Sequence, residues 1–227
     1  MFLPTTIKEV EARGWYELDV IIFSGDAYID HPAFGPAVIG RILEAEGYKV
    51  AIVPQPNWRD DLRDFKKLGK PRLFFAVTAG AMDSMVNHYT ANLRLRSNDA
   101  YTPGGKAGFR PDRTVDTYTQ ILKRLYPHTP VVVGGIEASL RRLTHYDYWS
   151  DKLRESILKT SGADLLIYGM GDKVIRDVAK AMRNGFNMKL LRGLRQVGFL
   201  ADKEYVERLY NQSSKVMSTY EECVEDK

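Results

Sequence analysis

Short apolar runs alternate with helical patterns along most of the chain, and this rhythm constrains the fold more than any other feature. Buried strands are predicted over residues 18–23, 49–53, 72–78, 131–133 and 164–168. Apolar residues recur at helical spacing over 34–46, 59–68, 115–125, 146–159 and 172–184, and Thr114 is expected to cap the third of these helices. Strands separated by helices favour a parallel sheet covered on both faces.

The expected architecture is therefore an α/β fold, doubly wound, with a mainly parallel five-stranded sheet in the flavodoxin-like order 2-1-3-4-5. That order places the topological switch between the first and third strands. The loops at 26–35 and 79–84 should then face each other at the carboxyl ends of the strands, with residues 134–139 beside them. Ligands of open α/β sheets bind in such a crevice, so the residues that follow the strands are the candidates for function.

Polar residues gather in the loop after the first strand. This loop offers Asp26, Tyr28, Asp30 and His31, and Gly35 stands at the start of the next helix. A helix start presents free backbone N–H groups and partial positive charge, which suit a phosphate or carboxylate ligand. The alternative is that Asp30 only caps the helix and that His31 makes local hydrogen bonds. Both interpretations stay open.

A pair of glycines ends the fourth strand. Without side chains, Gly134 and Gly135 let the backbone approach a ligand closely, and Glu137, Ser139 and Arg141 supply polar groups beside them. A simple turn at the end of a strand, with a solvated arginine, is the competing interpretation. The ligand-binding hypothesis takes these five residues together with the five of the first loop.

Several common sites are excluded by spacing. Glycines at 169 and 171 make only half of a dinucleotide fingerprint, the lysine at 106 lacks the Ser or Thr of a Walker loop, and no Gly-x-Ser-x-Gly elbow occurs. His145, Asp147 and Asp151 could ligate a metal, but a polar interdomain surface explains them equally well. We assign no catalytic residue and no metal ligand.

The chain carries 33 Lys+Arg against 29 Asp+Glu, a net charge of +4. A glycine- and proline-rich segment at 93–113 has no apolar period and a charge of +3. Together with Lys189, Arg192 and Arg195 it makes an RNA-binding module one alternative function. No apolar run reaches the roughly 20 residues of a membrane helix, so no membrane partner is expected. The charged start predicts a cytoplasmic protein, and a single cysteine, Cys223, excludes an internal disulfide.

Four motifs together resemble the N-terminal region of YgiQ-type radical SAM proteins: FLPTT at 2–6, GDAYIDHP at 25–32, GGIEASLRR at 134–142 and YGMGD at 168–172. The resemblance implies a [4Fe–4S] cluster and S-adenosylmethionine in the full-length family, held by a barrel with a three-cysteine run that this sequence lacks. It further implies a flavodoxin-like domain over 1–200 and a helical tail over 201–227 that leads to the barrel. This stretch alone should not be catalytic.

The leading region also resembles the cobalamin-binding domains that precede other radical SAM barrels. Those that ligate cobalt use Asp-x-His-x-x-Gly, whereas here Asp30, His31 and Gly35 have a different spacing. The resemblance implies an accessory domain that presents a substrate or a corrinoid to the barrel in cis. A corrinoid held without a protein ligand and a vestigial fold that binds no corrinoid both stay open. A free-standing nucleotide-binding domain is the third alternative.

Overall fold

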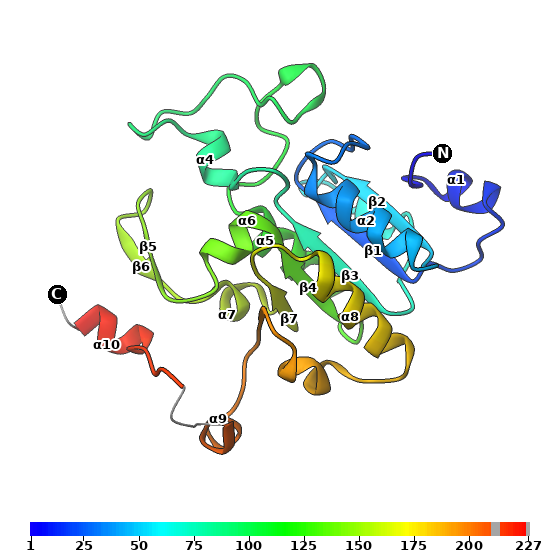
Figure 1. Ribbon diagram of the computed structural model, residues 1–227. Helices are drawn as coiled ribbons and strands as arrows, with labels where there is room; N and C mark the ends of the chain where they lie inside the picture. The colour runs from blue at the N-terminus through cyan, green and yellow to red at the C-terminus, as the bar shows by residue number, and fades with distance from the viewer. Residues whose placement is uncertain (210–213, 226–227) are drawn as a thin grey trace.

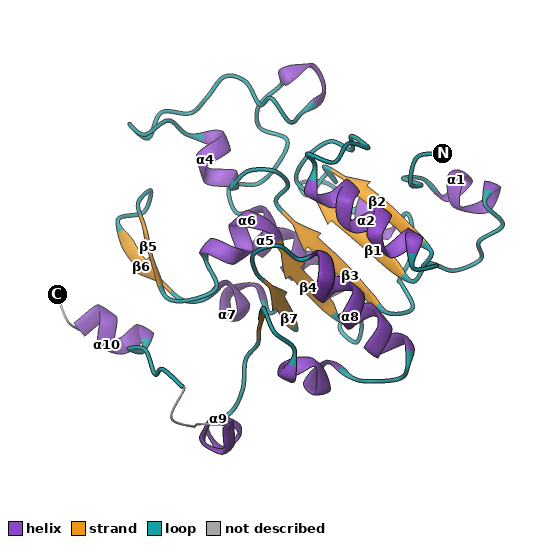
Figure 2. Ribbon diagram, viewed as in Figure 1, coloured by secondary structure: helices purple, strands orange, loops and turns teal. Residues whose placement is uncertain are grey.

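The computed structural model describes residues 1–209 and 214–225. Its centre is a six-stranded sheet in the order β2-β1-β3-β4-β7-β8 (Figures 1 and 2). Five of the strands run parallel: β1 (Val20–Ser24), β2 (Val50–Pro54), β3 (Phe74–Thr78), β4 (Val131–Gly134) and β7 (Leu165–Ile167). The predicted order 2-1-3-4-5 is confirmed for these five. A short sixth strand, β8 (Val197–Gly198), extends the edge antiparallel to β7.

Helices cover both faces of the sheet. One face carries α2 (Gly35–Ala45) and α8 (Asp172–Arg183), which lie side by side in front of the strands in Figure 1. The other face packs against α5 (Thr114–Leu125), α7 (Ile157–Ser161) and the short α3 (Arg63–Lys66). The doubly wound arrangement therefore follows from alternation of strands and helices, as the sequence predicts.

The strands form because both of their faces are buried. In β1, Val20 and Ile22 contact the α2 and α8 side, whereas Ile21 and Phe23 contact the α5 side. All four are at most 2% exposed, and burying each such side chain contributes about 1.5–3 kcal/mol. A run of apolar residues without polar alternation is typical of a central parallel strand.

The remaining elements lie around this sheet. Near the amino terminus is α1 (Ile7–Ala12), and beyond the carboxyl ends of the strands lie α4 (Ser84–His88) and α6 (Gly135–Leu140). Two 3₁₀ turns, Pro103–Gly105 and Met188–Gly193, occur in the connections. The segment from 89 to 113 projects past the strand ends as a long irregular loop (Figure 1). The 3₁₀ turn Pro103–Gly105 is the one helical element within residues 89–113, in agreement with the absence of an apolar period there.

Two sequence predictions of helix are wrong. Residues 146–159 contain a hairpin of β5 (His145–Asp147) and β6 (Lys152–Arg154), and helix begins only at Ile157. Aromatic residues favour strands, and Asp151 adopts the left-handed turn conformation with φ of 50°. The helix predicted over 59–68 is reduced to Arg63–Lys66, because the carboxylates of Asp60 and Asp61 bond to backbone N–H groups in a turn just before it.

The tail after residue 200 contains two short helices, α9 (Lys203–Leu209) and α10 (Tyr220–Glu225). Residues 214–219 between them are not helical, so helix does not run through the whole tail. The predicted helical tail also includes residues 210–213 and 226–227, which lie outside the described residues. Neither helix has a buried residue, as expected for a segment with few apolar anchors.

Candidate functional site

A cavity of about 390 Å³ opens at the carboxyl ends of the parallel strands, between the starts of α2 and α8. Its apolar floor includes Ile22, Val132 and Ile167 from the sheet and Ile39 from α2. Five glycines line its walls, and we call it the glycine pocket: Gly35, Gly134, Gly135, Gly169 and Gly171. A pocket therefore lies at the predicted end of the sheet, but no residue of the 79–84 loop lines it.

The glycine pair after β4 is required by the backbone. Gly135 has φ of +84°, and a Cβ atom there would lie 2.5 Å from Thr78 Oγ1 at the end of β3. Gly134 is extended, and a Cβ atom would lie 3.3 Å from the carbonyl oxygen of Ile167. Because Gly135 has no side chain, the chain can turn there directly from β4 into α6, and its peptide groups stay at the pocket wall.

Two helix starts border the glycine pocket. Neither α2 nor α8 has a side-chain hydrogen bond at its N-cap, where Phe34 and Gly171 stand. The first N–H groups of these helices are not satisfied by cap side chains, and they give the rim partial positive charge. Asp172, in the first turn of α8, adds a carboxylate to the lining. The pocket is thus apolar at its floor and polar at its rim.

Asp26 lies behind the pocket rather than in it. Its carboxylate is 1% exposed, lies 2.8 Å from Arg110 Nη2 and accepts a hydrogen bond from the backbone N–H of Ala81. Burial raises the pKa of Asp26, and the Arg110 charge opposes that shift. Arg110 also pairs with Asp99 and donates to the carbonyl of Ala79, so this buried cluster fixes the 89–113 loop to the sheet.

Glu137 is a buried bridge between two helix starts. One carboxylate oxygen accepts from the N–H of Ser84 at 3.1 Å, and the other accepts from the N–H of Val115 at 2.9 Å. Burial raises the pKa of this carboxyl group, and the hydrogen bonds oppose the shift. The expected cap for α5 was Thr114, but that residue is the first helical residue, and Glu137 satisfies the α5 start instead.

The other polar residues of the first loop face the outer side of α2. Tyr28 accepts from the N–H of Leu3 at 3.0 Å, and Asp30 pairs with Arg41, whose hydrogen bond lowers the pKa of Asp30. His31 Nδ1 accepts from the N–H of Ala33 at 3.1 Å. Asp30 and His31 line a separate shallow groove along α2. The structure therefore does not bring them into the glycine pocket.

Ser139 and Arg141 act beside the pocket. Ser139 Oγ accepts from the N–H of Gly169 at 3.1 Å, which ties α6 to the loop that follows β7. Arg141 is 7% exposed and forms an ion pair with Asp83, the N-cap of α4, with Nη2 at 3.1 Å from Oδ1. Of the ten residues predicted for ligand binding, Gly35, Gly134 and Gly135 line the pocket itself.

The model of the radical SAM N-terminal family matches residues 2–227 of this chain. The chain belongs to this family. A UPF0313 protein from Porphyromonas gingivalis is 61% identical over 226 residues, one from Bacteroides thetaiotaomicron is 71% identical over 182 residues, and one from Thermotoga neapolitana is 49% identical over 228 residues. The resemblance to YgiQ-type proteins is confirmed.

These relatives are much longer than the chain. It covers 36%, 29% and 40% of the three relatives, which in turn match 100%, 80% and 99% of its own length. Among solved structures, it is similar to a radical S-adenosylmethionine methyltransferase, TsrM, from Kitasatospora setae, with tryptophan and a SAM analog bound. That similarity has a TM-score of 0.47 at 19% identity and covers 74% of this chain and 26% of the other.

In this radical SAM N-terminal domain, sequence reasoning missed the far wall of the pocket. Gly169, Met170, Gly171 and Asp172 line it after β7, whereas their motif is interpreted from the sequence as half of a dinucleotide fingerprint and as part of the family resemblance, not as a binding site. Their position after a strand was the available signal. The alternative metal residues have other partners, since Asp147 pairs with Arg113 and Asp151 accepts from Tyr146. Across residues 1–209 and 214–225, no helix has the length and apolarity to cross a bilayer.

Proposed function

We propose that this domain binds an organic ligand in the glycine pocket and presents it to a catalytic barrel in the longer proteins of the family. The observation that carries the proposal is the position of the pocket, at the strand ends beside the topological switch, where ligands of open α/β sheets bind. Its volume of about 390 Å³ lies within the range of small-molecule sites.

A corrinoid is the ligand class that we favour. The pocket is too small for the whole macrocycle but has an apolar floor and a polar rim that suit an appended nucleotide. No histidine lines it, and His31 is engaged with the N–H of Ala33 beside the other groove. No residue that lines the pocket could therefore serve as a histidine ligand, and the residues of the pocket rim would hold a corrinoid through its appended nucleotide.

The iron–sulfur chemistry implied by the family would lie outside this chain. A [4Fe–4S] cluster needs several cysteine thiolates, and the sequence contains only Cys223, which belongs to α10. The residues present do not fit the cluster. We assign the cluster and S-adenosylmethionine to the barrel, and to this domain we assign ligand binding.

Exposed apolar side chains near the pocket suggest where the barrel would pack. Ile136 and Leu140 of α6 and Met170 of the pocket wall are all exposed, and Met170 is 78% exposed. Apolar side chains that gather beside a binding site are typical of an interaction surface. A barrel that packs on this side would cover the mouth of the glycine pocket.

The RNA-binding alternative receives less support from the loop on which it rests. Of its five basic residues, Arg110 is fully buried between two carboxylates and Arg113 pairs with Asp147. Only Arg94, Arg96 and Lys106 are exposed. We therefore place the function at the strand ends.

Retention of hydroxocobalamin tests the proposal. The domain is mixed with the corrinoid, passed through a gel-filtration column and examined by absorbance for bound corrinoid. Gly35→Leu should abolish retention, because a Cβ atom at Gly35 meets open space and Gly35 lines the pocket. Gly193→Leu is the matched control, since a Cβ atom there also meets nothing and Gly193 does not line the pocket.

Two results would count against the proposal. If the wild-type domain retains no corrinoid, this ligand is rejected. If both leucine variants retain as much as the wild type, the glycine pocket is not the binding site.

A further inference from the structure

The loop that follows β7 forms one wall of the glycine pocket and has few anchors of its own. We call residues 168–171 the wall loop. Tyr168 packs against the core. The other three residues offer no such anchor, because two of them are glycines and Met170 is 78% exposed. Packing therefore contributes little to the shape of the wall loop beyond Tyr168, and hydrogen bonds fix it.

Gln196 holds the wall loop from outside the pocket. Its Nε2 donates to the carbonyl of Tyr168 and to the carbonyl of Met170, each at 3.4 Å. The backbone carbonyl of Gln196 accepts from the N–H of Tyr168 at 3.1 Å. Ser139 Oγ accepts from the N–H of Gly169, also at 3.1 Å. Two residues that are distant in the sequence thus fix four backbone groups of the wall loop.

The backbone of Gln196 adopts an unfavourable conformation. Its φ is 60°, in the left-handed region that residues with a Cβ atom rarely enter. The strand β8 starts at the next residue and pairs antiparallel with the end of β7. A glycine would adopt this conformation without strain and would keep the backbone pairing. The glutamine is therefore explained by its amide group, which a glycine lacks.

The contact between Gln196 and Met170 sets the direction of one backbone donor. The peptide bonds of the described residues are trans, and the C=O and N–H of a trans peptide point in opposite directions. Because the carbonyl of Met170 points toward Gln196, the N–H of Gly171 in the same peptide group points away from it. This N–H has no hydrogen-bond partner among the described residues. Gly171 lines the pocket, whereas Gln196 does not.

We propose that Gln196 is a positioning residue of the glycine pocket. Its amide holds two carbonyls of the wall loop so that the N–H of Gly171 is available to an acceptor atom of the ligand. This inference rests on the function proposed above, because it requires a ligand in that pocket. Since Gln196 also leads directly into β8, a ligand that orders the wall loop should order residues 196–199 with it.

Two substitutions at this position separate the amide from the backbone strain. Gln196→Ala and Gln196→Gly both remove the amide, but only glycine relieves the left-handed conformation. Gln196→Gly should therefore be the more stable of the two in urea unfolding. Both should weaken binding of hydroxocobalamin by the same factor, about fivefold to tenfold, in an absorbance titration. A merely structural role predicts instead that the loss of binding follows the loss of stability.

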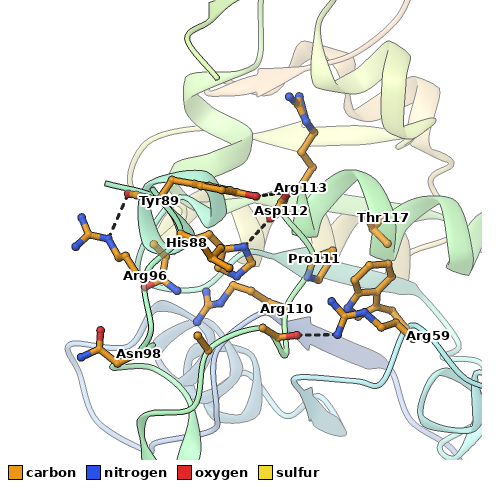
Figure 3. Close-up of a pocket in the computed structure, with 15 residues that line it drawn as sticks. Arg59, His88, Tyr89, Arg96, Asn98, Arg110, Pro111, Asp112, Arg113 and Thr117 are labelled. Carbon is orange, nitrogen blue, oxygen red and sulfur yellow. Dashed lines mark hydrogen bonds and ion pairs between the residues drawn. The ribbon is translucent and has the colours of Figure 1, made fainter. Parts of the chain in front are cut away.

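Leu93→Gly is the matched control. Leu93 also has a left-handed φ, of 58°, so glycine relieves the same kind of strain there. It belongs to the 89–113 loop, whose own cavity of about 600 Å³ (Figure 3) shares no lining residue with the glycine pocket. This variant should bind hydroxocobalamin as tightly as the wild type does.

Hydrogen–deuterium exchange tests the role of Gln196 without depending on corrinoid binding. In the ligand-free domain, both Gln196 variants should exchange faster than the wild type over 168–172. Hydroxocobalamin should slow exchange over 168–172 and 196–199 together in the wild type, and over 196–199 it should have no effect in the variants.

The proposal is overturned if exchange over 168–172 is unchanged in both ligand-free variants, or if both variants bind hydroxocobalamin as tightly as the wild type. It is also overturned if the loss of binding is confined to the less stable variant. If the wild-type domain binds no corrinoid, the function proposed above fails, and exchange of the ligand-free variants alone decides whether Gln196 holds the wall loop.

Discussion

Replacing Arg110 by methionine should destabilise the domain strongly and release the 89–113 loop. The guanidinium is fully buried and lies between Asp26 and Asp99, each 1% exposed. It also donates to the carbonyl of Ala79 at 3.0 Å. Methionine fills a similar volume but leaves two carboxylates buried without their cation. The loop would lose the contact that fixes it to the end of β3.

The expected magnitude follows from these contacts. Breaking a buried ion pair by removal of one partner costs about 3–5 kcal/mol, because the remaining charge stays buried. With a slope of about 2–3 kcal/mol per molar urea, the unfolding midpoint should fall by about 1–2.5 M. A total stability of about 10 kcal/mol, the middle of the usual range, would still keep most molecules folded.

The loss of stability in Arg110→Met should depend on pH. Burial raises the pKa of Asp26 above its usual 3.8, and Arg110 opposes that shift, so the variant should have a still higher pKa at this carboxyl group. A carboxyl group whose folded pKa is raised binds more protons in the folded than in the unfolded state. Stability then falls as pH rises from about 3.8 through the folded pKa. The deficit of Arg110→Met should therefore be smaller at pH 4 than at pH 7.

Urea unfolding monitored by circular dichroism at both pH values measures the deficit, and limited trypsin digestion reports on the loop. Arg94→Met is the control, because Arg94 belongs to the same loop but is exposed. In Arg110→Met, cleavage at Arg94, Arg96 and Lys106 should become faster. An unfolding midpoint equal to that of wild type, or a deficit that grows on acidification, would refute the buried-cluster argument.

Three further outcomes are expected. Gly135→Ala should lower the free energy of unfolding by about 1–3 kcal/mol, because φ is +84° and Cβ would meet Thr78, whereas Gly35→Ala should change it little; equal urea midpoints would contradict this. Glu137→Ala should cost about 1–3 kcal/mol for each backbone N–H left unpaired, and calorimetry showing an unchanged melting temperature would contradict its bridging role. Anaerobic reconstitution of the domain with iron and sulfide should give no stable cluster absorbance, since Cys223 stands alone; a robust signal would reassign the iron–sulfur site.

The sheet could be predicted because its information is local. Each parallel strand is a compact apolar run followed by glycine or polar residues. A strand that is buried on both faces requires apolar residues at nearly every position, so its sequence is easily recognised. The hairpin at 145–154 was not predicted, because its aromatic and charged residues also match the spacing of a helix. The short strand β8 has only two residues, too few for any periodicity.

The site residues were predicted less completely, because their partners are distant in sequence. Nothing near Glu137 indicates that it bonds to the N–H groups of Ser84 and Val115, which are 53 and 22 residues away. Asp26 likewise forms an ion pair with Arg110, which is 84 residues away in the sequence. Gly135 could be predicted because the need for a positive φ and for close approach belongs to the residue itself. Polar residues in a loop predict a site, but only the tertiary fold decides which of them face the ligand.

Hydrogen–deuterium exchange of the domain with and without hydroxocobalamin tests the glycine pocket most directly. We expect slower exchange in the segments that line it, at 33–39, 134–136 and 169–175, with exchange over 87–113 unchanged. Slowing confined to 87–113, or no change at the strand ends in the presence of bound corrinoid, would contradict the assignment of the pocket as the ligand site.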